Sequence, residues 1–529
     1  MKQIIDLKNW NFKINSLHFE KQVTLPHTWN VDDNMQVQLY RGRSEYSTEV
    51  DIDLLKNKTA VLYFGCAFHT AEVYVNGAFA GAHKGSGYTP FEFDITAYLT
   101  EGKNSILVTV DNDKNNEMLP HALDYDWADD GGLIRNVTLA ICDNNDLFDM
   151  SVTYTLDSMI DTVCSGVMDI AVHCVPQAAE IEVVDFKTNE TVINRSVFID
   201  SVISFPFENL KLWNTESPNL YIVKIKSDSD EISKRIGFRT IEVKDTKVLL
   251  NGKSIYMKGC EWMPGSHPKY GMAEPFEHSV KRLSQLKNAG CIFTRFHWQQ
   301  DTSIFDWCDE NGLLVQEEIP YWGHPKKATP LQLAIAKEQA DAMVHYHTHH
   351  PSIICWGVGN ELGGEKRETI QYVNTMYDYL KSKDPTRLVN YVSNTLSLKN
   401  LLTKDDAAKH GDIAMWNEYL GLWQPCNNVK KTIFETYKRC GNMPSMVTEF
   451  GLCEPHFKGG DERRTEILLE RIPIYKSLPN MVGYVWFSLN DYRTHCGEAG
   501  EGKMKQRIHG STDLYADEKP SYKVFSEIE

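Results

Sequence analysis

The strongest constraint on the fold is a change in the pattern of apolar residues near residue 241. Beyond this point, short apolar runs alternate with amphipathic stretches of helical periodicity, which predicts strands separated by helices. The apolar runs cover 255–259, 291–296, 313–319, 352–358, 388–392, 413–417, 445–449 and 481–489, and the clearest helical stretches cover 279–289, 331–347, 369–383 and 464–477. Eight such runs in about 280 residues predict a (β/α)8 barrel for residues 241–529.

The first 240 residues follow an all-β pattern instead. Runs of alternating apolar and polar residues occur at 60–64, 71–75, 91–95 and 105–110, and Asn76-Gly77 gives a hairpin signal after the second of them. Residues 1–145 are therefore predicted to form a β-sandwich of the jelly-roll type. A second stretch over 146–240, with about seven candidate strands, fits an immunoglobulin-like β-sandwich. The boundary falls in the polar segment 143–146.

Length, charge and cysteine spacing limit the class of protein. At 529 residues the chain is too long for one compact domain, and roughly three domains are expected. A net charge of −17 without a long basic run argues against nucleic acid or an anionic membrane surface as a partner. The 12 cysteines are spaced singly, with no Cys-x-x-Cys pair, so a structural zinc site is not expected.

The sequence also bears on location. No segment approaches the roughly 18 apolar residues of a membrane-spanning helix. Residues 1–15 contain no signal-peptide pattern. We therefore expect a cytoplasmic protein if Met1 is the native start, and a secreted or periplasmic one if a signal peptide has been removed.

The ends of the predicted barrel strands carry two carboxylates. The fourth run leads into Asn360-Glu361, and the seventh ends at Glu449. Other run ends supply Arg295, His297, Asn417, Tyr419 and Trp486. In an α/β barrel, the carboxyl ends of the strands meet on the face where such enzymes place their catalytic groups. Two carboxylates on separate strands suit glycoside hydrolysis, in which one protonates the leaving oxygen and the other attacks or activates water.

Structural interpretations of the same residues remain open at this point. On spacing alone, Asn360-Glu361 fits a cap at the start of the next helix as well as it fits a catalytic pair. An isolated glutamate at a strand end is more often structural. The functional interpretation rests on the joint occurrence of both carboxylates with the surrounding Arg, Tyr and Trp residues. A catalytically inert carbohydrate-binding protein is the non-enzyme alternative, because a fold does not determine function.

The segment that contains Glu361 resembles the acid/base signature of glycoside hydrolase family 2, which includes β-galactosidases, β-glucuronidases and β-mannosidases. That signature reads N-H-P-S-hydrophobic-hydrophobic-x-W-S-x-x-N-E, and here His349 replaces the Asn and Gly357 replaces the Ser. Further family-like segments follow the family's domain order at 25–30, 73–77, 87–96, 131–135, 236–239 and 251–253. The resemblance covers nearly the whole chain and implies an exo-acting β-glycosidase.

The resemblance implies roles for the matched residues. Glu361 would be the acid/base, and Glu449 would be the nucleophile of a retaining mechanism through a covalent glycosyl-enzyme, with the two carboxyl groups about 5–5.5 Å apart. Asn360 would bond the 2-hydroxyl of the sugar, and Tyr419 would hold the nucleophile. Arg295 would keep Glu449 ionised through its opposite charge.

Three further residues are expected to bind substrate. His297 lies in Arg295-Phe296-His297-Trp298, one residue shorter than the family's R-x-x-H-Y-P pattern, so its contact with the sugar is an open point. Trp486 matches a tryptophan that serves as a platform for the sugar ring, and Asn417 belongs to the segment that contains Tyr419. Retaining hydrolysis needs no metal, so neither a metal nor another cofactor is predicted.

The resemblance leaves several sugars open. Family β-glucuronidases hold the sugar carboxylate with an N-x-K element after the last strand, whereas in this chain Arg507-x-His509 is expected to place cationic groups near that position. An arginine fork can hold a carboxylate, although a solvated basic loop fits these residues equally well. The chain ends soon after the barrel, so a β-glucuronidase is favoured, with a β-galactosidase next and a β-galacturonidase or β-mannosidase after it. Asp126 lies near the position of a sugar-binding aspartate. Family members are often dimers or tetramers, so a homo-oligomer is an open expectation.

Overall fold

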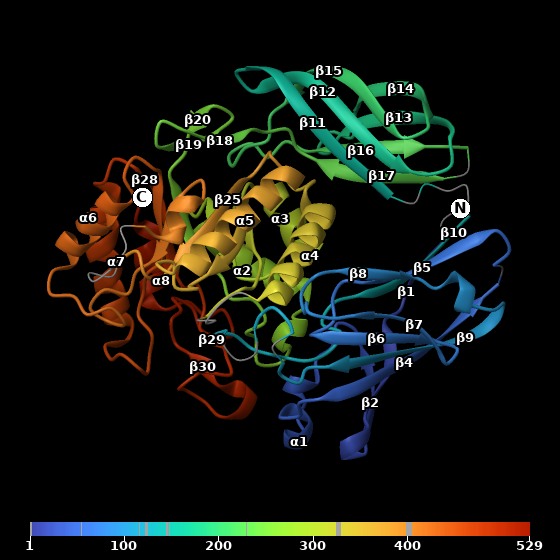
Figure 1. The fold of residues 1–529 in the computed structure, drawn as a ribbon, viewed down its shortest axis with the longest axis horizontal. Coiled ribbons are helices and arrows are strands. Elements are labelled where there is room, and N and C mark those ends of the chain that lie inside the picture. Colours follow the sequence, from blue (N-terminus) through green and yellow to red (C-terminus); the bar gives the residue numbers. More distant parts are fainter. Residues whose placement is uncertain are drawn as a thin grey trace.

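The computed structural model describes residues 3–53, 55–115, 117–121, 125–143, 147, 149–228, 230–323, 329–397 and 405–529. Two β-sandwiches precede a closed parallel barrel, so the predicted fold class is confirmed. Both sandwiches lie against the barrel (Figure 1). The predicted boundary between residues 145 and 146 lies outside the described ranges.

The N-terminal sandwich consists of two antiparallel sheets. Its elements are β1 (Gln3–Asp6), β2 (Asn9–Ile14), β3 (Phe19–Thr24), α1 (Met35–Gln38), β4 (Arg43–Ile52), β5 (Lys58–Phe64), β6 (Thr70–Val75), β7 (Ala78–His83), β8 (Phe91–Asp94), β9 (Gly102–Asp111) and β10 (Val137–Asp143). The sheets have the strand orders β1-β10-β5-β8 and β3-β2-β4-β9-β6-β7. Every second side chain of β5 and β6 is buried, because a strand presents alternate residues to the core between the sheets.

The second sandwich follows the same rule with fewer strands. Its elements are β11 (Asp149–Ile160), β12 (Val163–His173), β13 (Gln177–Asp185), β14 (Thr191–Ile199), β15 (Val202–Lys211), β16 (Tyr221–Lys226) and β17 (Glu231–Ile236). They form the sheets β11-β12-β15 and β14-β13-β16-β17. Just beyond β17, the buried guanidinium of Arg239 donates hydrogen bonds to the carbonyl oxygens of Pro351 and Ile353 in the barrel. This contact ties the second sandwich to the segment that leads to Glu361.

A short sheet, formed by β18 (Ile241–Lys244), β19 (Lys247–Leu250) and β20 (Lys253–Ser254), leads into the barrel. The barrel strands are β21 (Met257–Glu261), β22 (Phe293–Phe296), β23 (Leu314–Glu318), β24 (Ile353–Asn360), β25 (Leu388–Ser393), β26 (Ala414–Asn417), β27 (Ser445–Glu449) and β28 (Met481–Phe487). They close in sequence order, and each overlaps one of the eight predicted runs. Every residue of β24 is buried, as expected for a strand covered on both faces.

Helices surround the barrel strands (Figure 1). They are α2 (Phe276–Asn288), α3 (Thr302–Asn311), α4 (Pro330–His347), α5 (Arg367–Lys383), α6 (Val429–Arg439), α7 (Gly460–Lys476) and α8 (Pro520–Glu527). Helix α4 starts where the sequence provides a capping box, in which the side chains of Thr329 and Gln332 each accept a hydrogen bond from the other's backbone N–H, with Pro330 as the first helical residue between them. None of the helices in the described ranges combines the length and the apolar character needed to cross a bilayer.

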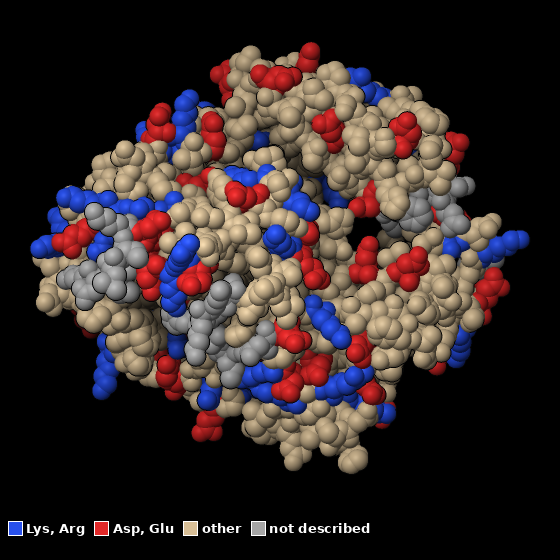
Figure 2. Space-filling view, in the orientation of Figure 1, with Lys and Arg blue, Asp and Glu red and all other residues tan. Residues whose placement is uncertain are grey.

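A set of contacts, here called the interdomain clasp, joins residues 125–130 of the N-terminal sandwich to residues 492–507 of the barrel. The latter segment contains β29 (Tyr492–Arg493) and β30 (Gln506–Arg507). Arg493 and Asp130, both buried, form two hydrogen bonds of 2.7 and 3.0 Å, and Lys503 pairs with Asp129 at 2.6 Å. Figure 2 shows acidic and basic side chains densely intermingled where the N-terminal sandwich meets this part of the barrel.

Candidate active site

A cavity of about 470 Å³ lies at the carboxyl end of the barrel strands. Seven of the eleven residues predicted for the site line it: Glu361, Glu449, Tyr419, His297, Asp126, Arg507 and His509. The structure therefore brings together carboxylates from β24 and β27 with side chains contributed by the N-terminal sandwich. Of the other four, Arg295 and Asn417 donate hydrogen bonds to the lining carboxylates, and Asn360 accepts hydrogen bonds from both of these residues. Trp486 bonds Ser511, which does not line the cavity.

Glu449, the last residue of β27, has donors on both carboxylate oxygens. Arg295 Nη1 donates to Oε1 at 2.9 Å, and the Tyr419 hydroxyl donates to Oε2 at 2.8 Å. Burial raises the pKa of Tyr419 well above its ordinary value of 10, so its hydroxyl remains a donor. Only 6% of Glu449 is exposed, and the side chain is held in one orientation at the wall of the cavity.

The charge state of Glu449 is a balance of opposing effects. Burial raises the pKa of its carboxyl to about 7, Arg295 opposes the rise, and the nearby carboxylates of Glu361 and Glu261 add to it. The charge of Glu361 therefore affects the protonation of Glu449, as expected for two neighbouring carboxylates. The guanidinium and the Tyr419 hydroxyl favour the ionised form at Glu449.

The path of the backbone at the end of β24 determines where Glu361 points. The pairing between β24 and β25 shifts register between Gly357 and Asn360, an irregularity that re-aims side chains at strand ends. Glu361 itself has a φ of 56°, a left-handed conformation that is unfavourable for a non-glycine residue and is found at functional sites. Its Oε1 accepts a 2.7 Å hydrogen bond from Asn417.

Gly357 makes room for a neighbouring carboxylate. A Cβ atom at this position would lie 2.1 Å from Cγ of Glu318, so no larger residue fits beside that side chain. Glu318 in turn pairs with the guanidinium of Arg295 and accepts a 2.7 Å hydrogen bond from Gln316. The glycine at the position where the resemblance predicts Ser is therefore linked to the orientation of Arg295.

Asn360 and Asn417 do not line the cavity but lie next to Glu361 and Glu449. The Asn360 amide oxygen accepts hydrogen bonds from Arg295 at 2.7 Å and from Asn417 at 3.2 Å. Its amide nitrogen is buried and has no partner among the described residues. Asn417 lies next to Glu449 in the register of β26 and β27, and it also bonds Glu361. Asn417 therefore bonds one carboxylate and lies beside the strand residue that carries the other.

His297 contacts carboxylates rather than standing free in the cavity. Its Nε2 lies 3.0 Å from Glu261 and 3.6 Å from Glu449, and the ring of Trp127 stacks on it at 5.5 Å. Burial, the largest single influence, lowers the pKa of His297, but the carboxylates of Glu261 and Glu318 oppose it and the pKa rises to about 10. The sequence prediction omits Glu261 because the first apolar run ends at Gly259, two residues before β21 ends. Glu261 is the last residue of its strand, so the rule that polar residues at strand ends are candidate site residues identifies it once the strand is given its full length.

One part of the cavity wall is formed by ion-paired residues of the interdomain clasp. Arg507 pairs with Asp126, and its Nε also lies 3.4 Å from Glu498. Asp126 accepts further hydrogen bonds from Tyr492 at 3.0 Å and Thr494 at 2.8 Å. Both predicted residues of this wall, Asp126 and Arg507, thus face the cavity, and each is paired with the other.

The prediction that His509 supplies a cationic group is wrong. Burial lowers the pKa of His509 well below 6.5, and the positive charge of Arg507 lowers it further. Its ring stacks on Tyr492 and meets Phe487 edge-on. His509 is therefore a neutral, buried ring at the cavity wall, and Arg507 is the one cation of the predicted pair.

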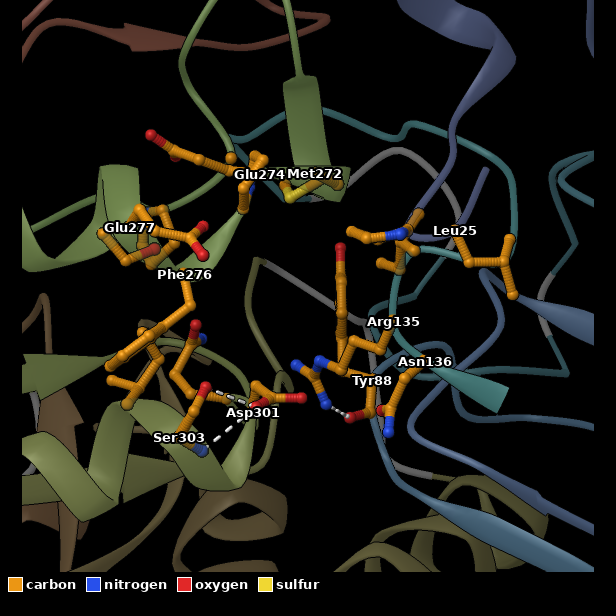
Figure 3. A pocket seen from close by; sticks show the side chains of 18 of the residues that line it. Leu25, Tyr88, Arg135, Asn136, Met272, Glu274, Phe276, Glu277, Asp301 and Ser303 are labelled. Atoms are coloured by element: carbon orange, nitrogen blue, oxygen red, sulfur yellow. Dashed lines mark hydrogen bonds between the residues drawn. The ribbon is translucent and has the colours of Figure 1, made fainter. Parts of the chain in front are cut away.

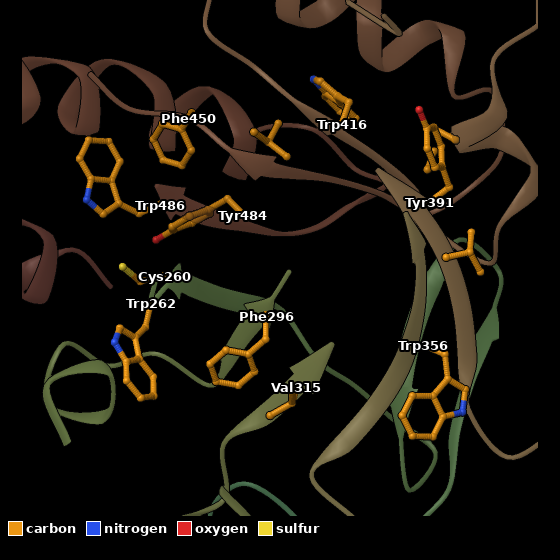
Figure 4. Close-up of a cluster of buried hydrophobic side chains, with 14 of the residues drawn as sticks. Cys260, Trp262, Phe296, Val315, Trp356, Tyr391, Trp416, Phe450, Tyr484 and Trp486 are labelled. Atoms are coloured by element: carbon orange, nitrogen blue, oxygen red, sulfur yellow. The ribbon is translucent and has the colours of Figure 1, made fainter. Parts of the chain in front are cut away.

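The prediction that Trp486 is a platform for a sugar ring is also wrong. Trp486 is 0% exposed, donates its indole N–H to Ser511 at 2.9 Å and packs edge-on against Phe450 in the layer between barrel and helices (Figure 4). The neighbouring Phe487 lines the cavity instead. Successive residues of a strand face opposite sides, so an offset of one residue exchanges a cavity-lining ring for a core ring.

Three tryptophans that the sequence reasoning did not single out also line the cavity. Trp127 comes from the N-terminal sandwich, Trp322 follows β23, and Trp423 follows β26. Trp423 is 43% exposed and stacks on His456 at 4.2 Å, and the guanidinium of Arg507 lies 6.0 Å from the centre of its ring. Aromatic faces of this kind pack well against the apolar faces of a ring-shaped ligand.

A second cavity of about 510 Å³ lies between the N-terminal sandwich and the barrel (Figure 3). It is lined by residues of both domains, among them Tyr88, Arg135 and Glu274. The guanidinium of Arg135 donates to the carbonyl oxygens of Tyr88 and Gln299, which joins the two domains. None of the predicted site residues lines this cavity, so the candidate chemistry belongs to the smaller one.

Three regions of the chain match models of one protein family. Residues 241–468 match "Glycosyl hydrolases family 2, TIM barrel domain", residues 5–143 match "Glycosyl hydrolases family 2, sugar binding domain", and residues 170–239 match "Glycosyl hydrolases family 2". The three matches together span most of the chain and follow the order of the domains described above.

Individual relatives carry different substrate names. The chain is 29% identical to a β-galactosidase of Thermoanaerobacterium thermosulfurigenes over 97% of its own length and 74% of the relative's. It spans 48% and 55% of the lengths of two other relatives.

Solved structures share the fold of this chain. Its fold matches a β-D-glucuronidase of Dictyoglomus thermophilum with a TM-score of 0.88 and 22% identity, and the match covers 99% of this chain and 96% of that protein. It also matches a β-galacturonidase of Eisenbergiella tayi, with a TM-score of 0.84, 24% identity and coverage of 99% and 97%.

Proposed function

Because the chain belongs to glycosyl hydrolase family 2, we propose that it is a retaining exo-β-glycosidase acting on terminal β-linked sugars. The observation that carries this proposal is the pair of carboxylates that line one cavity, Glu361 directly after strand β24 and Glu449 at the end of β27. Their surroundings differ, since a guanidinium and a tyrosine hydroxyl bond Glu449 while an amide bonds Glu361. Unequal surroundings are what an acid and a nucleophile require.

In the proposed first step, Glu449 attacks the anomeric carbon while Glu361 donates its proton to the departing glycosidic oxygen. In the second step, Glu361 takes a proton from water, the water oxygen bonds to the anomeric carbon, and the bond to Glu449 breaks. Arg295 and Tyr419 hold the carboxylate of Glu449 in place for attack. The unpartnered amide nitrogen of Asn360 is the proposed donor to the sugar 2-hydroxyl.

For the sugar, we propose a neutral β-hexoside, with a β-galactoside as the first candidate. One of the two grounds for expecting a β-glucuronide is a pair of cations, Arg507 and His509, and His509 is neutral. Arg507 already pairs with Asp126 and Glu498, so a substrate carboxylate placed there would face two carboxylates. The Arg507–Asp126 pair instead offers a donor and an acceptor to hydroxyl groups. A β-uronide is the second candidate, favoured by the position of Arg507 in the cavity wall.

A panel of nitrophenyl β-glycosides tests the proposed activity and the proposed sugar together. We expect kcat/KM for the β-galactoside to exceed those for the β-glucuronide and β-galacturonide by at least about tenfold, within the range that pocket contacts provide. Release of nitrophenol from none of the glycosides would contradict the glycosidase proposal. Faster release from a uronide would overturn the neutral sugar and favour the second candidate.

Glu498 gives a separate test of whether the carboxylates around Arg507 disfavour a substrate that carries a carboxylate. Replacing it, as Glu498→Gln, removes one of the two carboxylates that compensate Arg507. We expect the ratio of uronide to galactoside kcat/KM to rise by about tenfold, since one pKa unit of electrostatic interaction corresponds to such a factor. Glu501→Gln is the matched control, with the same change of charge in the same loop. An unchanged ratio in Glu498→Gln would show that Arg507 does not select substrates by charge.

A further inference from the structure

A buried carboxylate lies beside the proposed nucleophile and has no role in the proposed reaction. Glu261, the last residue of β21, is 0% exposed. Its Oε2 accepts a 3.1 Å hydrogen bond from Arg295 Nη1, which also bonds Glu449. Its Oε1 lies 3.0 Å from His297 Nε2, and the same nitrogen lies 3.6 Å from Oε1 of Glu449. Glu261 therefore contacts both cationic side chains that face the nucleophile.

We propose that Glu261 is a positioning residue that holds His297 as an imidazolium against Glu449, so that two cations face Oε1 of the nucleophile. This inference rests on the proposed role of Glu449. It extends that role by assigning a function to a residue that never reaches the substrate cavity, since Glu261 does not line it.

The charges around His297 favour its protonated form. Glu261 approaches from β21, Glu318 from β23 at 3.8 Å and Glu449 from β27, while Arg295 on β22 is the neighbouring cation. The Trp127 ring covers one face of the imidazole and limits its contact with water. Three carboxylates against one guanidinium leave an excess of negative charge, which a proton on the ring reduces. The pKa of His297 accordingly lies at about 10, although burial alone would lower it.

Two other arrangements are less consistent with these contacts. A neutral imidazole would accept a hydrogen bond at Nδ1 from Arg295, whose Nη2 lies 3.4 Å away. That arrangement leaves the ring without charge among three carboxylates. A metal ion would also suit the ligand atoms of Glu261, His297 and Glu449, which lie within 4.8 Å of one another. The guanidinium of Arg295 already bridges the two carboxylates, so we assign an imidazolium instead.

The second cation has a defined effect in the proposed reaction. When the bond between the anomeric carbon and Glu449 breaks, its electron pair returns to the carboxylate, and nearby positive charge stabilises that product. In the free enzyme, the same charge favours ionised Glu449 and opposes the rise in pKa caused by burial. Loss of the imidazolium should therefore move the acid limb of the pH profile to higher pH.

A double-variant cycle tests the inference. In His297→Gln, Glu261 stays next to Glu449 without the imidazolium beside its Oε1, and we expect the acid limb of kcat/KM for nitrophenyl β-galactoside to rise by about one pH unit. In the double variant Glu261→Gln/His297→Gln the negative charge of Glu261 is also gone, and the acid limb should return towards that of the wild type. The second substitution thus reverses the shift of the acid limb that the first one causes. Such non-additivity is expected for residues in contact.

Several outcomes would overturn the inference. A merely structural Glu261 predicts a double variant with an acid limb at least as high as that of His297→Gln. A neutral ring predicts that His297→Gln leaves the acid limb at the wild-type position. Glu317→Gln is the matched control, since Glu317 is equally buried and pairs with His347 at 3.0 Å, away from the cavity. A wild-type protein inactive on every glycoside would contradict the proposed function itself, a result distinct from the failure of this cycle.

Discussion

Glu449→Gln will reduce hydrolysis of nitrophenyl β-galactoside by roughly 10⁴-fold or more, the scale of loss expected when a covalent nucleophile is removed. An amide cannot form the glycosyl ester, and it cannot carry the negative charge that Arg295 balances in the wild type. The substituted side chain keeps the size of Glu and can still accept a hydrogen bond from Tyr419. Steady-state kinetics measure the loss, and thermal unfolding shows whether the fold is retained.

Glu418 provides a matched control for this variant. It is buried one residue before Tyr419, and burial raises the pKa of its carboxyl to about 7, the same value as for Glu449. Its Oε1 accepts a 2.7 Å hydrogen bond from Tyr475 on α7, and it does not line the cavity. Glu418→Gln should change activity far less than Glu449→Gln. Comparable losses in the two variants would remove Glu449 from the role of nucleophile and point to a general effect on the barrel.

Glu361→Gln will slow the hydrolysis of substrates with poor leaving groups much more than that of substrates with good leaving groups. A poor leaving group, such as the glucose of a disaccharide, needs a proton, and we expect its hydrolysis to fall by roughly 10²–10⁴-fold, the usual contribution of a general acid. A dinitrophenyl group leaves without a proton, so formation of the glycosyl-enzyme from that substrate should be little affected. Pre-steady-state release of dinitrophenol measures this first step. Equal losses for both substrates would contradict an acid role for Glu361.

The pH profile of the same variant gives an independent test. In the wild type the reactive form has Glu449 ionised and Glu361 protonated, so kcat/KM should fall at low pH as Glu449 gains a proton and at high pH as Glu361 loses one. The acid limb should lie above the ordinary carboxyl value of 4.5, because burial raises the pKa of Glu449. In Glu361→Gln the acid limb should remain and the alkaline limb should disappear for the dinitrophenyl glycoside. A retained alkaline limb would assign it to another group.

The sequence predicted the architecture well because the fold follows from local periodicity. All eight apolar runs beyond residue 241 overlap barrel strands, and Glu361 and Glu449 line one cavity as strand ends of a barrel should. Their roles remain proposals. The errors concern features that periodicity does not encode. Trp486 and Phe487 are adjacent, and only the register of the last strand decides which ring lines the cavity.

Contacts between distant segments account for the rest. Arg507 and Asp126 are separated by 381 positions, and no local pattern shows that each neutralises the other. The neutral state of His509 follows from burial and from the cations around it, which depend on tertiary packing. Glu261 ends the first barrel strand, so the strand-end rule would have identified it, whereas its contact with His297 becomes visible only in the closed barrel.

Because of the interdomain clasp, the candidate active site is formed by residues of two separate domains. The N-terminal sandwich has its own hydrophobic core, and so has the barrel, yet the cavity wall takes Asp126 and Trp127 from the first and Arg507 from the second. Catalytic competence is therefore a property of the docked pair rather than of the barrel alone. Mild denaturing conditions that separate the two units would abolish turnover while the secondary structure of each persists, so activity would report domain docking before any spectroscopic signal of unfolding.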